Sequence, residues 1–285
     1  MITLINKKIG FIGQGWIGKN YADDFERRGF KVVRYSLEEP YINNAEKIKD
    51  CDIVFIAVPT PTTPKGFDSS YVKEVMKYVG KGKIAVIKST LLPGTTELIQ
   101  AANPNIFVLH SPEFLVEATA AYDAANPTRN IIGIPFDNEE YQAKARIVME
   151  VLPRAPFELI CPIKTAEFIK YGCNGFLYMK VILANLLFDL ASQLGCDYQL
   201  VKQAMAADPR IGLSHLEPVH KSGRGAGGHC FIKDFAALTN LYKEVVDDNL
   251  GLSVLEALQS KNIDLLKQSK KDFDLLAQVY ELNFN

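Results

Sequence analysis

A glycine-rich turn between a predicted strand and a predicted helix restricts most strongly how this chain can fold. The turn reads Gly13-Gln14-Gly15-Trp16-Ile17-Gly18 and follows the apolar run 8–12. The first glycine permits a tight turn, the second lets the backbone approach a pyrophosphate, and the third lets helix and strand pack closely. Exposed amides and the positive helix end then favour an anion. We therefore predict a dinucleotide site; the alternative is a glycine-rich turn without a ligand.

Short apolar runs alternate with helical spacing through the first half of the chain. Strands are predicted at 8–12, 30–35, 52–58, 83–88, 106–110 and 130–134, and the segments 69–79 and 139–151 have helical spacing. Strands rich in Val, Ile and Phe that alternate with helices are typical of a parallel sheet with crossover helices. We expect an α/β fold, a Rossmann-type doubly wound parallel sheet, as an NAD(P)-binding domain over residues 1–162.

A long central helix and a small all-helical domain are expected over residues 163–285. Nothing breaks a helix over 165–194 apart from two tolerable glycines, and a third glycine follows as a cap. Its second half is apolar on nearly every side, which implies burial all round. Lys180, Asn185 and Asp189 interrupt it too often for a membrane span. We therefore predict a homodimer built on this helix.

Composition narrows the class of partner. The 285 residues include 48% hydrophobic and 23% charged residues, as in soluble globular proteins. Because 32 Lys and Arg oppose 33 Asp and Glu, no basic field favours nucleic acid or an anionic membrane. The start of the chain lacks a secretory pattern, and five cysteines form no CxxC pair. We expect a cytoplasmic protein with reduced cysteines, a small-molecule partner and, since its four histidines are scattered, no metal site.

The end of the second predicted strand leaves NAD and NADP open. An NAD site usually has a carboxylate there, but this strand ends at Ser36. Ser36 can replace the carboxylate, Glu38 can swing in, or Arg34 can meet a 2′-phosphate. In the alternative interpretation all three side chains are merely exposed. The sequence therefore predicts weak discrimination between the two cofactors.

The next three predicted strands end in polar segments at the ligand edge of the sheet. Two of them lead into Pro59-Thr60-Pro61-Thr62 and Ser89-Thr90, whose hydroxyls and prolines suit a loop that touches a cofactor. The third leads to Glu113 and Glu117, which we expect on one face of a short helix, where like charges raise the proton affinity of a carboxylate. Each segment alone also fits an ordinary loop or a solvated surface pair.

Three side chains in the second half can do chemistry. Lys170 and Asn174 are one helical turn apart and could together steady an oxyanion; the alternative is a snorkelling lysine and a packing asparagine. Cys230 follows Gly227-Gly228-His229 at the predicted start of a helix, with Lys233 close by. Both the helix end and the lysine favour a nucleophilic thiolate. The other cysteines fit small core side chains.

In this order the motifs resemble the UDP-glucose and GDP-mannose dehydrogenase family, NAD-dependent enzymes that oxidise a nucleotide-sugar alcohol twice to the uronic acid. The matching stretches are GFIGQGWIG, VPTPT, KSTLLPGTT, SPEFLVEATAAYDAANPTRNIIG, TAEFIKYGCNGF, DPRIG and GAGGHCFIKD, between residues 7 and 241. The resemblance departs in three respects. Family members continue into a second α/β domain that grips the nucleotide, whereas the sequence here ends at Asn285. Its segment 35–52 is short, and GGHC and FIKD resemble branches that act on different sugars.

The resemblance implies a role for each matching residue. Cys230 matches the catalytic cysteine, Lys170, Asn174 and Asp234 match groups around the thiohemiacetal and attacking water, and Thr90 matches the active-site threonine. Of the matching loop glutamates, Glu113 and Glu117, one serves acid and base steps and the other lies near cofactor and water. The expected cofactor contacts are Gly13, Gln14, Gly15, Trp16, Ile17, Gly18, Ser36, Pro59, Thr60, Pro61, Thr62, Ser89, Thr90, Glu117 and Lys233. The expected substrate contacts are Glu113, Phe114, Leu115, Lys170, Asn174, Arg210, Gly225 and Gly227.

Two other functions are compatible with the sequence. A one-step β-hydroxyacid dehydrogenase would also combine a Rossmann domain, a long helix and a lysine, but it would not need Cys230. A truncated, cofactor-binding protein without activity would fit the missing domain, but it would not need the cysteine, lysine, asparagine and aspartate together. Of these alternatives, the sequence favours oxidation of a UDP-glucose-like substrate.

Overall fold

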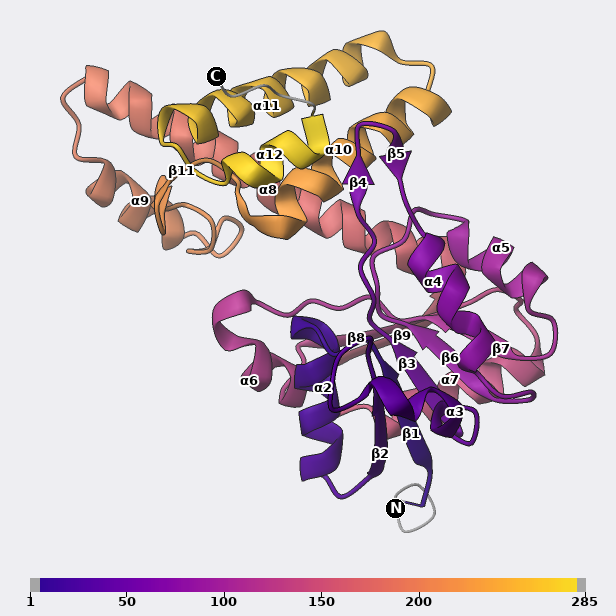
Figure 1. Ribbon diagram of the computed structural model, residues 1–285. Coiled ribbons are helices and arrows are strands. Elements are labelled where there is room, and N and C mark those ends of the chain that lie inside the picture. The colour runs from indigo at the N-terminus through magenta and orange to yellow at the C-terminus, as the bar shows by residue number, and fades with distance from the viewer. Residues whose placement is uncertain (1–5, 281–285) are drawn as a thin grey trace. The chain divides into compact units, whose positions relative to one another are not determined.

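The computed structural model describes residues 6–280 and divides the chain into two compact units (Figure 1). Unit 1 contains the chain up to Thr60 together with residues 68–170. Unit 2 contains residues 61–67 and the chain from Tyr171 onward. The sequence placed the change of domain at residue 162. The first turns of the long helix, however, belong to unit 1, and a short hairpin from the first half belongs to unit 2.

Unit 1 is built on a seven-stranded sheet with the strand order β2-β1-β3-β6-β7-β8-β9. The six predicted strands are confirmed to within about two residues at each end. A seventh strand, β9, was not predicted. The strands are β1 (Lys8–Ile12), β2 (Lys31–Tyr35), β3 (Ile53–Ile56), β6 (Ile84–Ile87), β7 (Phe107–His110), β8 (Arg129–Ile134) and β9 (Phe157–Pro162).

The sequence predicted a parallel sheet, but one pair of strands in it is antiparallel. Strands β2, β1, β3, β6 and β7 are parallel, whereas β8 pairs antiparallel with β7 and parallel with β9. Between β7 and β8 the longest helix is α6 (Ala120–Ala125). Its six residues rise only about 9 Å, too little to return the chain to the opposite end of the sheet for a parallel crossover.

Helices cover both faces of the sheet (Figure 1). On one face α2 (Trp16–Arg27), α6 and α7 (Glu139–Val151) bury a core in which the rings of Phe11 and Phe55 stack 5.1 Å apart. The other helices of unit 1 are α3 (Ala45–Ile48), α4 (Ser70–Val75) and α5 (Thr95–Ala102), with the 3₁₀ turns η1 (Ile42–Asn44), η2 (Met76–Tyr78) and η3 (Glu117–Thr119). Burial on both faces explains why the strands are continuous apolar runs.

The order of the strands determines where a ligand can bind. Strand β1 lies between β2 and β3, so the direction in which strands are added reverses there. Open α/β sheets bind ligands at the carboxyl ends of strands beside such a reversal. The glycine turn follows β1 and the Pro59 loop follows β3, so both lie at this edge. The strand order ends at β2, which is therefore an edge strand, and the segment between β2 and β3 holds only η1 and α3.

Unit 2 is mainly helical (Figure 1). Its elements are α8 (Ile163–Gln193, shared with unit 1), α9 (Tyr198–Ala206), α10 (Gly228–Val245), α11 (Asn249–Gln268), α12 (Phe273–Tyr280) and the hairpins β4–β5 (Thr62–Thr63, Gly66–Phe67) and β10–β11 (Val219–His220, Gly223–Arg224). The long helix is confirmed: α8 has 31 residues. Its core contact is a stack of Tyr178 on Phe235, with ring centroids 3.8 Å apart, beside Ile182 and Leu265.

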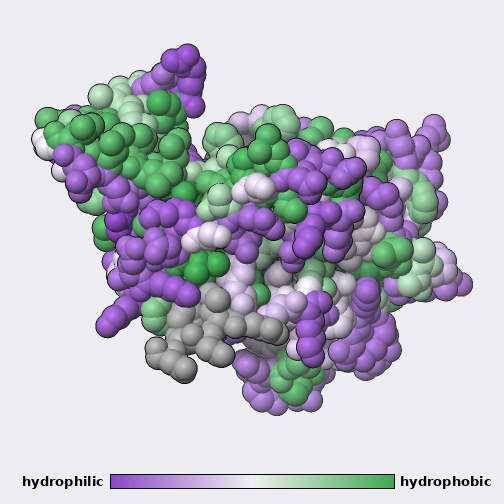
Figure 2. Space-filling view, turned by 90° about the horizontal axis from the view of Figure 1, so that it is seen from above, coloured by the Kyte–Doolittle hydropathy of each residue, from purple (hydrophilic) through white to green (hydrophobic). Residues whose placement is uncertain are grey.

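One row of apolar side chains on α8 is not buried. The space-filling view shows apolar patches at the surface (Figure 2). The sequence predicted burial on all sides of the second half of this helix, and Val181 and Ile182 are indeed covered within unit 2. Five others are at least 42% exposed: Phe176, Met179, Leu183, Leu186 and Leu190. By length and hydropathy, α8 is also the one described helix that could cross a membrane, a test that core helices of soluble proteins pass too.

Candidate active site

The turn between β1 and α2 has the geometry of a pyrophosphate cradle. At Gly13, whose φ is +89°, a Cβ would lie 2.2 Å from the Ala57 carbonyl oxygen, and at Gly18 a Cβ would lie 1.9 Å from the Gly13 oxygen. Only glycine fits either position. Gly15, the N-cap of α2, has no atom within 4 Å of its Cβ position, and no side chain caps this helix end. The open backbone N–H groups there suit the pyrophosphate of NAD.

Ser89 ties the ends of β3 and β6 together at the same edge. Its Oγ donates to the Val58 carbonyl at 2.7 Å and accepts from the Val58 N–H at 3.0 Å. Thr60 is buried, and Thr90 is partly exposed. The predicted Pro59–Thr62 segment is divided, because Pro61 and Thr62 belong to unit 2 and Thr62 pairs in the β4–β5 hairpin.

The loop after β7 holds a buried ion pair. Lys170 Nζ donates to Glu113 Oε1 at 2.7 Å and to the Glu113 carbonyl oxygen at 2.8 Å, with side chains only 6% and 4% exposed. Glu113 Oε2 also accepts from the Leu115 N–H at 2.9 Å. Removing one partner would leave the other charge buried. The loop and α8 are therefore fixed to each other within unit 1.

The predicted helical face shared by Glu113 and Glu117 is wrong. Residues 111–116 are irregular, and Glu117 is exposed at the start of η3. Pro112 disfavours a helical conformation at the preceding residue, and Lys170 draws the Glu113 carboxylate inward. The two carboxylates therefore have different surroundings, and only Glu113 is buried.

Two buried polar side chains beside this pair were missed from the sequence. Lys88, just after β6, donates to Ser111 Oγ at 3.1 Å and lies 4.4 Å from the Tyr21 ring centroid. Burial lowers the pKa of Lys88 to about 8. Burial also lowers the pKa of His110 to about 3, so this imidazole is neutral at pH 7. Their position at the carboxyl ends of strands was the available signal, but both follow apolar runs that read as core.

Glu167 was also missed, and it organises the loop that leads from Thr90. Its carboxylate accepts from the N–H groups of Gly94 and Thr96, at 2.6 and 2.8 Å, and from Thr96 Oγ1 at 2.6 Å. These groups form the N-terminus of α5, so a carboxylate from α8 caps that helix. Glu167 and Lys170 thus each fix one loop of the ligand edge. Burial raises the pKa of Glu167 despite these bonds.

In unit 2, Cys230 lies in the first turn of α10, as predicted, and is exposed. One turn further, Asp234 is buried and accepts from Asn174 Nδ2 at 2.6 Å. Lys233 Nζ donates to the other oxygen of Asp234. Asn174 and Asp234, which come from motifs 60 residues apart, therefore meet one turn from the cysteine.

The glycine loop that precedes Cys230 is held by α11 and by the turn that follows α11. Asn262 accepts from the Ala226 N–H at 2.7 Å and donates to its carbonyl at 3.0 Å. Buried Lys271 donates to the Gly225 oxygen at 3.0 Å, and Asp272 Oδ2 accepts from the Gly228 N–H at 2.7 Å. The sequence did not indicate these three side chains, because each bond joins residues at least 36 apart.

The remaining predicted residues lie in varied surroundings. Arg210 is exposed and pairs with Asp208 at 2.6 Å. The Phe114 ring lies 3.8 Å from the Arg129 guanidinium, and Leu115 packs partly against the core. At Gly227 a Cβ would lie 2.0 Å from Asp272 Oδ2, so a side chain would displace that carboxylate. Within residues 6–280, no group of three or more His, Cys, Asp or Glu could hold a metal ion.

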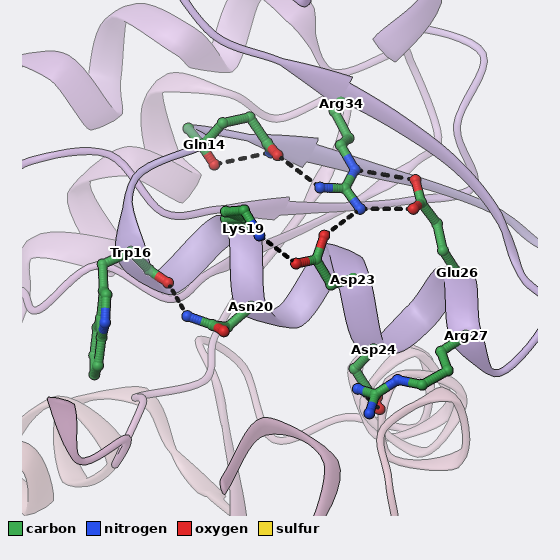
Figure 3. Close-up of polar contacts among 10 residues, drawn as sticks. Gln14, Trp16, Lys19, Asn20, Asp23, Asp24, Glu26, Arg27 and Arg34 are labelled. Carbon is green, nitrogen blue, oxygen red and sulfur yellow. Dashed lines mark hydrogen bonds and ion pairs between the residues drawn. The ribbon is translucent and has the colours of Figure 1, made fainter. Parts of the chain in front are cut away.

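Ser36, Glu38 and Arg34, the three residues that could contact the cofactor ribose, do not have equivalent surroundings. Ser36 Oγ donates to the Glu38 carbonyl at 3.1 Å, within its own turn. Arg34 is buried against Glu26 and Asp23 of α2, so the interpretation that all three are merely exposed is wrong (Figure 3).

The sheet, with its reversal of strand order at β1, and the glycine cradle define a dinucleotide-binding protein. Residues 40–151 match the NAD-binding domain of the UDP-glucose/GDP-mannose dehydrogenase family, and residues 164–263 match the central domain of that family. The chain belongs to this family and carries its NAD-binding domain.

Known proteins agree with this assignment. A UDP-glucose 6-dehydrogenase of Rickettsia typhi is 32% identical over 267 residues, which cover 90% of this chain and 58% of that protein. The solved UDP-glucose dehydrogenase of Pyrobaculum islandicum superposes with a TM-score of 0.79 at 28% identity, covering 91% of this chain and 68% of that one. Mycobacterium tuberculosis 3-hydroxyisobutyrate dehydrogenase, at 15% identity and a TM-score of 0.73 over 98% and 100% of the two chains, shares the fold. The chain spans little more than half the length of the curated relatives it matches.

Proposed function

We propose that this chain oxidises the C6 alcohol of a nucleotide sugar, with UDP-glucose as the favoured type, to the carboxylate in two NAD-dependent steps. The observation that carries the proposal is the Asn174–Asp234 hydrogen bond one turn from Cys230. It joins the motif of the long helix to the motif of the cysteine helix. A one-step alcohol dehydrogenase would have no use for an exposed thiol at a helix N-terminus beside this pair.

The chemistry divides into two oxidations and a hydrolysis. NAD, when bound, accepts one hydride in each oxidation. After the first oxidation, the Cys230 thiolate adds to the aldehyde carbon and the oxygen takes a proton, which gives a thiohemiacetal. The second oxidation removes hydride and that proton to leave a thioester, and water then cleaves the C–S bond to release the carboxylate and the thiol. Cys230 thus retains the aldehyde between the oxidations.

The other residues have assigned tasks in the proposal. The Lys170 ammonium and the Asn174 amide donate to the developing oxyanions. Asp234 orients the Asn174 amide through their 2.6 Å bond. Glu113 is the acid and base of the loop, and its contact with Lys170 holds the carboxylate in place. Thr90 and Glu117 serve near the cofactor and the attacking water, and Arg210 reaches the substrate.

Product stoichiometry tests the proposal. The purified chain is incubated with NAD and, in turn, a UDP-hexose, a UDP-N-acetylhexosamine, GDP-mannose and a β-hydroxyacid. We expect two NADH per sugar consumed, together with the uronic acid, for one nucleotide sugar. One NADH per hydroxyacid would support the one-step alternative. The fold that the chain shares with 3-hydroxyisobutyrate dehydrogenase is compatible with that alternative. Cofactor binding with no turnover of any substrate would contradict the proposal and support a protein without activity.

A further inference from the structure

Arg34, next to last in β2, is held in a clamp by two carboxylates of α2 (Figure 3). Its Nε donates to Glu26 Oε1 at 3.0 Å and its Nη2 to Glu26 Oε2 at 2.7 Å, a bidentate pair. Nη2 also pairs with Asp23 Oδ1 at 2.7 Å. The Arg34 side chain is 8% exposed, whereas those of Asp23 and Glu26 are 40% and 49% exposed. The arginine is therefore inside the clamp and the carboxylates face solvent.

The clamp lies beside the glycine cradle. Arg34 Nη1 points to Gln14 Oε1 at 3.5 Å, and Gln14 Nε2 donates to the Gly13 carbonyl at 3.0 Å (Figure 3). In dinucleotide-binding sheets, the end of the second strand and this turn flank the adenosine ribose. The clamp therefore occupies the region where the 2′-hydroxyl of NAD and the 2′-phosphate of NADP differ.

The charges in the clamp balance within it. Lys19 pairs with Asp23 Oδ2 at 2.6 Å, so two cations face two carboxylates. Burial alone would lower the pKa of Arg34, but its bonds to Glu26 and Asp23 outweigh burial and raise that pKa. The residues of the clamp line a hollow on the surface together with Lys47. Lys47 is exposed and donates to the Asn44 side chain. The positive charge of the buried arginine is thus already compensated by carboxylates.

We propose that Asp23 and Glu26, by engaging Arg34, select NAD against NADP and so replace the carboxylate that the end of β2 lacks. Only Nη1 of Arg34, which has a single contact of 3.5 Å with Gln14 Oε1, is left to donate to a 2′-phosphate, and a phosphate held there would be repelled by the two carboxylates of the clamp. A 2′-hydroxyl carries no charge and meets neither obstacle. This inference reverses the weak discrimination predicted from the sequence. It rests on the NAD-binding domain and not on the proposed sugar oxidation.

Binding measurements test the inference without turnover. Trp16 is the only tryptophan of the chain, opens α2 beside the cradle and is 41% exposed, so its fluorescence reports on cofactor binding. NAD and NADP are titrated into wild type, Glu26→Gln and Asp23→Asn/Glu26→Gln at about 0.15 M salt, with calorimetry as a second method. We expect wild type to bind NAD at least about tenfold more tightly than NADP. The double variant should lower this ratio at least about threefold, through tighter NADP binding.

The matched control is Glu139→Gln/Glu150→Gln, which removes two exposed carboxylates from α7 and should leave the ratio unchanged. Circular dichroism checks that each variant is folded. If the double variant does not fold, the single variant Glu26→Gln, which retains the Arg34–Asp23 ion pair, takes its place in the test. A wild-type ratio below tenfold would overturn the inference. So would a clamp variant whose ratio stays within threefold of wild type, or a control that shifts as much as the clamp variant.

Discussion

At the scale of single residues, the candidate site is held by contacts between residues far apart in the sequence. Cys230 was placed correctly because a glycine turn that leads into an apolar helical pattern is a local signal. Lys88, His110 and Glu167 were missed because their surroundings depend on the tertiary fold. Glu167, for example, bonds to Thr96, 71 residues away. Glu113 was expected beside Glu117, but a partner 57 residues away determines where it points.

The first prediction concerns Cys230→Ser. We expect the variant to bind NAD as wild type does, because the cradle lies on another helix, and to form acid at least about a thousandfold more slowly, because an unactivated hydroxyl is a far poorer nucleophile than a thiolate. Trp16 fluorescence measures the binding, and uronic acid is measured directly. Cys196→Ser, at another exposed cysteine, is the control. Acid formation at the wild-type rate would remove Cys230 from the mechanism.

The second prediction concerns the buried Lys88. Its pKa in the folded chain is about 8, below the usual value of 10.5, so the unfolded chain binds more protons between these limits. The free energy of unfolding therefore rises with pH between about 8 and 10.5, and the cost of burying the charge is fully present below pH 8.

We expect the free energy of unfolding of Lys88→Met to lack this rise. The free energy of unfolding of the variant minus that of wild type should therefore be higher at pH 7 than at pH 10, by on the order of 3 kcal/mol. Urea unfolding at both pH values measures this difference, and Lys144→Met at a partly exposed site on α7 is the control. The prediction is wrong if the difference between wild type and Lys88→Met is the same at both pH values.

At the scale of elements, the sequence predicted those whose pattern is complete within a short window. The inner strands are apolar throughout, and α8 is an uninterrupted helical run, so both were found. Strand β9 was missed because Glu158 interrupts its sequence, which leaves only Leu159-Ile160-Cys161 as an apolar run. The direction of β8 depends on the length of α6, and no pattern within β8 itself encodes it.

The cap of α5 by Glu167 gives a prediction at this scale. Glu167→Gln keeps the shape of the side chain but turns an amide donor toward the donors at Gly94 and Thr96. We expect the free energy of unfolding to fall by about 1 to 3 kcal/mol, as for a buried group that loses its partner. Urea denaturation measures the loss. Glu97→Gln, which removes a 40% exposed partner of Lys164 in the same region, should cost less than about 1 kcal/mol. Equal losses in the two variants would contradict the cap.

At the scale of the whole molecule, the exposed row of apolar side chains on α8 is a candidate surface for association with a partner. Phe176, Met179, Leu183, Leu186 and Leu190 are spaced alternately by three and four residues, as along the seam of two paired helices. Unit 2 covers the opposite side of α8 through Tyr178 and Ile182. A second copy of this chain supplies an identical row, and a twofold axis makes such a surface complementary to itself.

We therefore predict a homodimer through this row. Ten half-exposed side chains, five from each copy, would contribute roughly 7 to 15 kcal/mol on burial, against an association cost of about 4 to 15 kcal/mol. The balance is narrow enough for one charge to reverse it. Leu186→Asp should be monomeric by light scattering at micromolar concentration where wild type is dimeric, while Leu200→Asp, at a 64% exposed site on α9, should stay dimeric. A monomeric wild type would refute the dimer. Recovery of the wild type only with membranes would also refute the dimer and would indicate that lipid contacts the exposed row of α8.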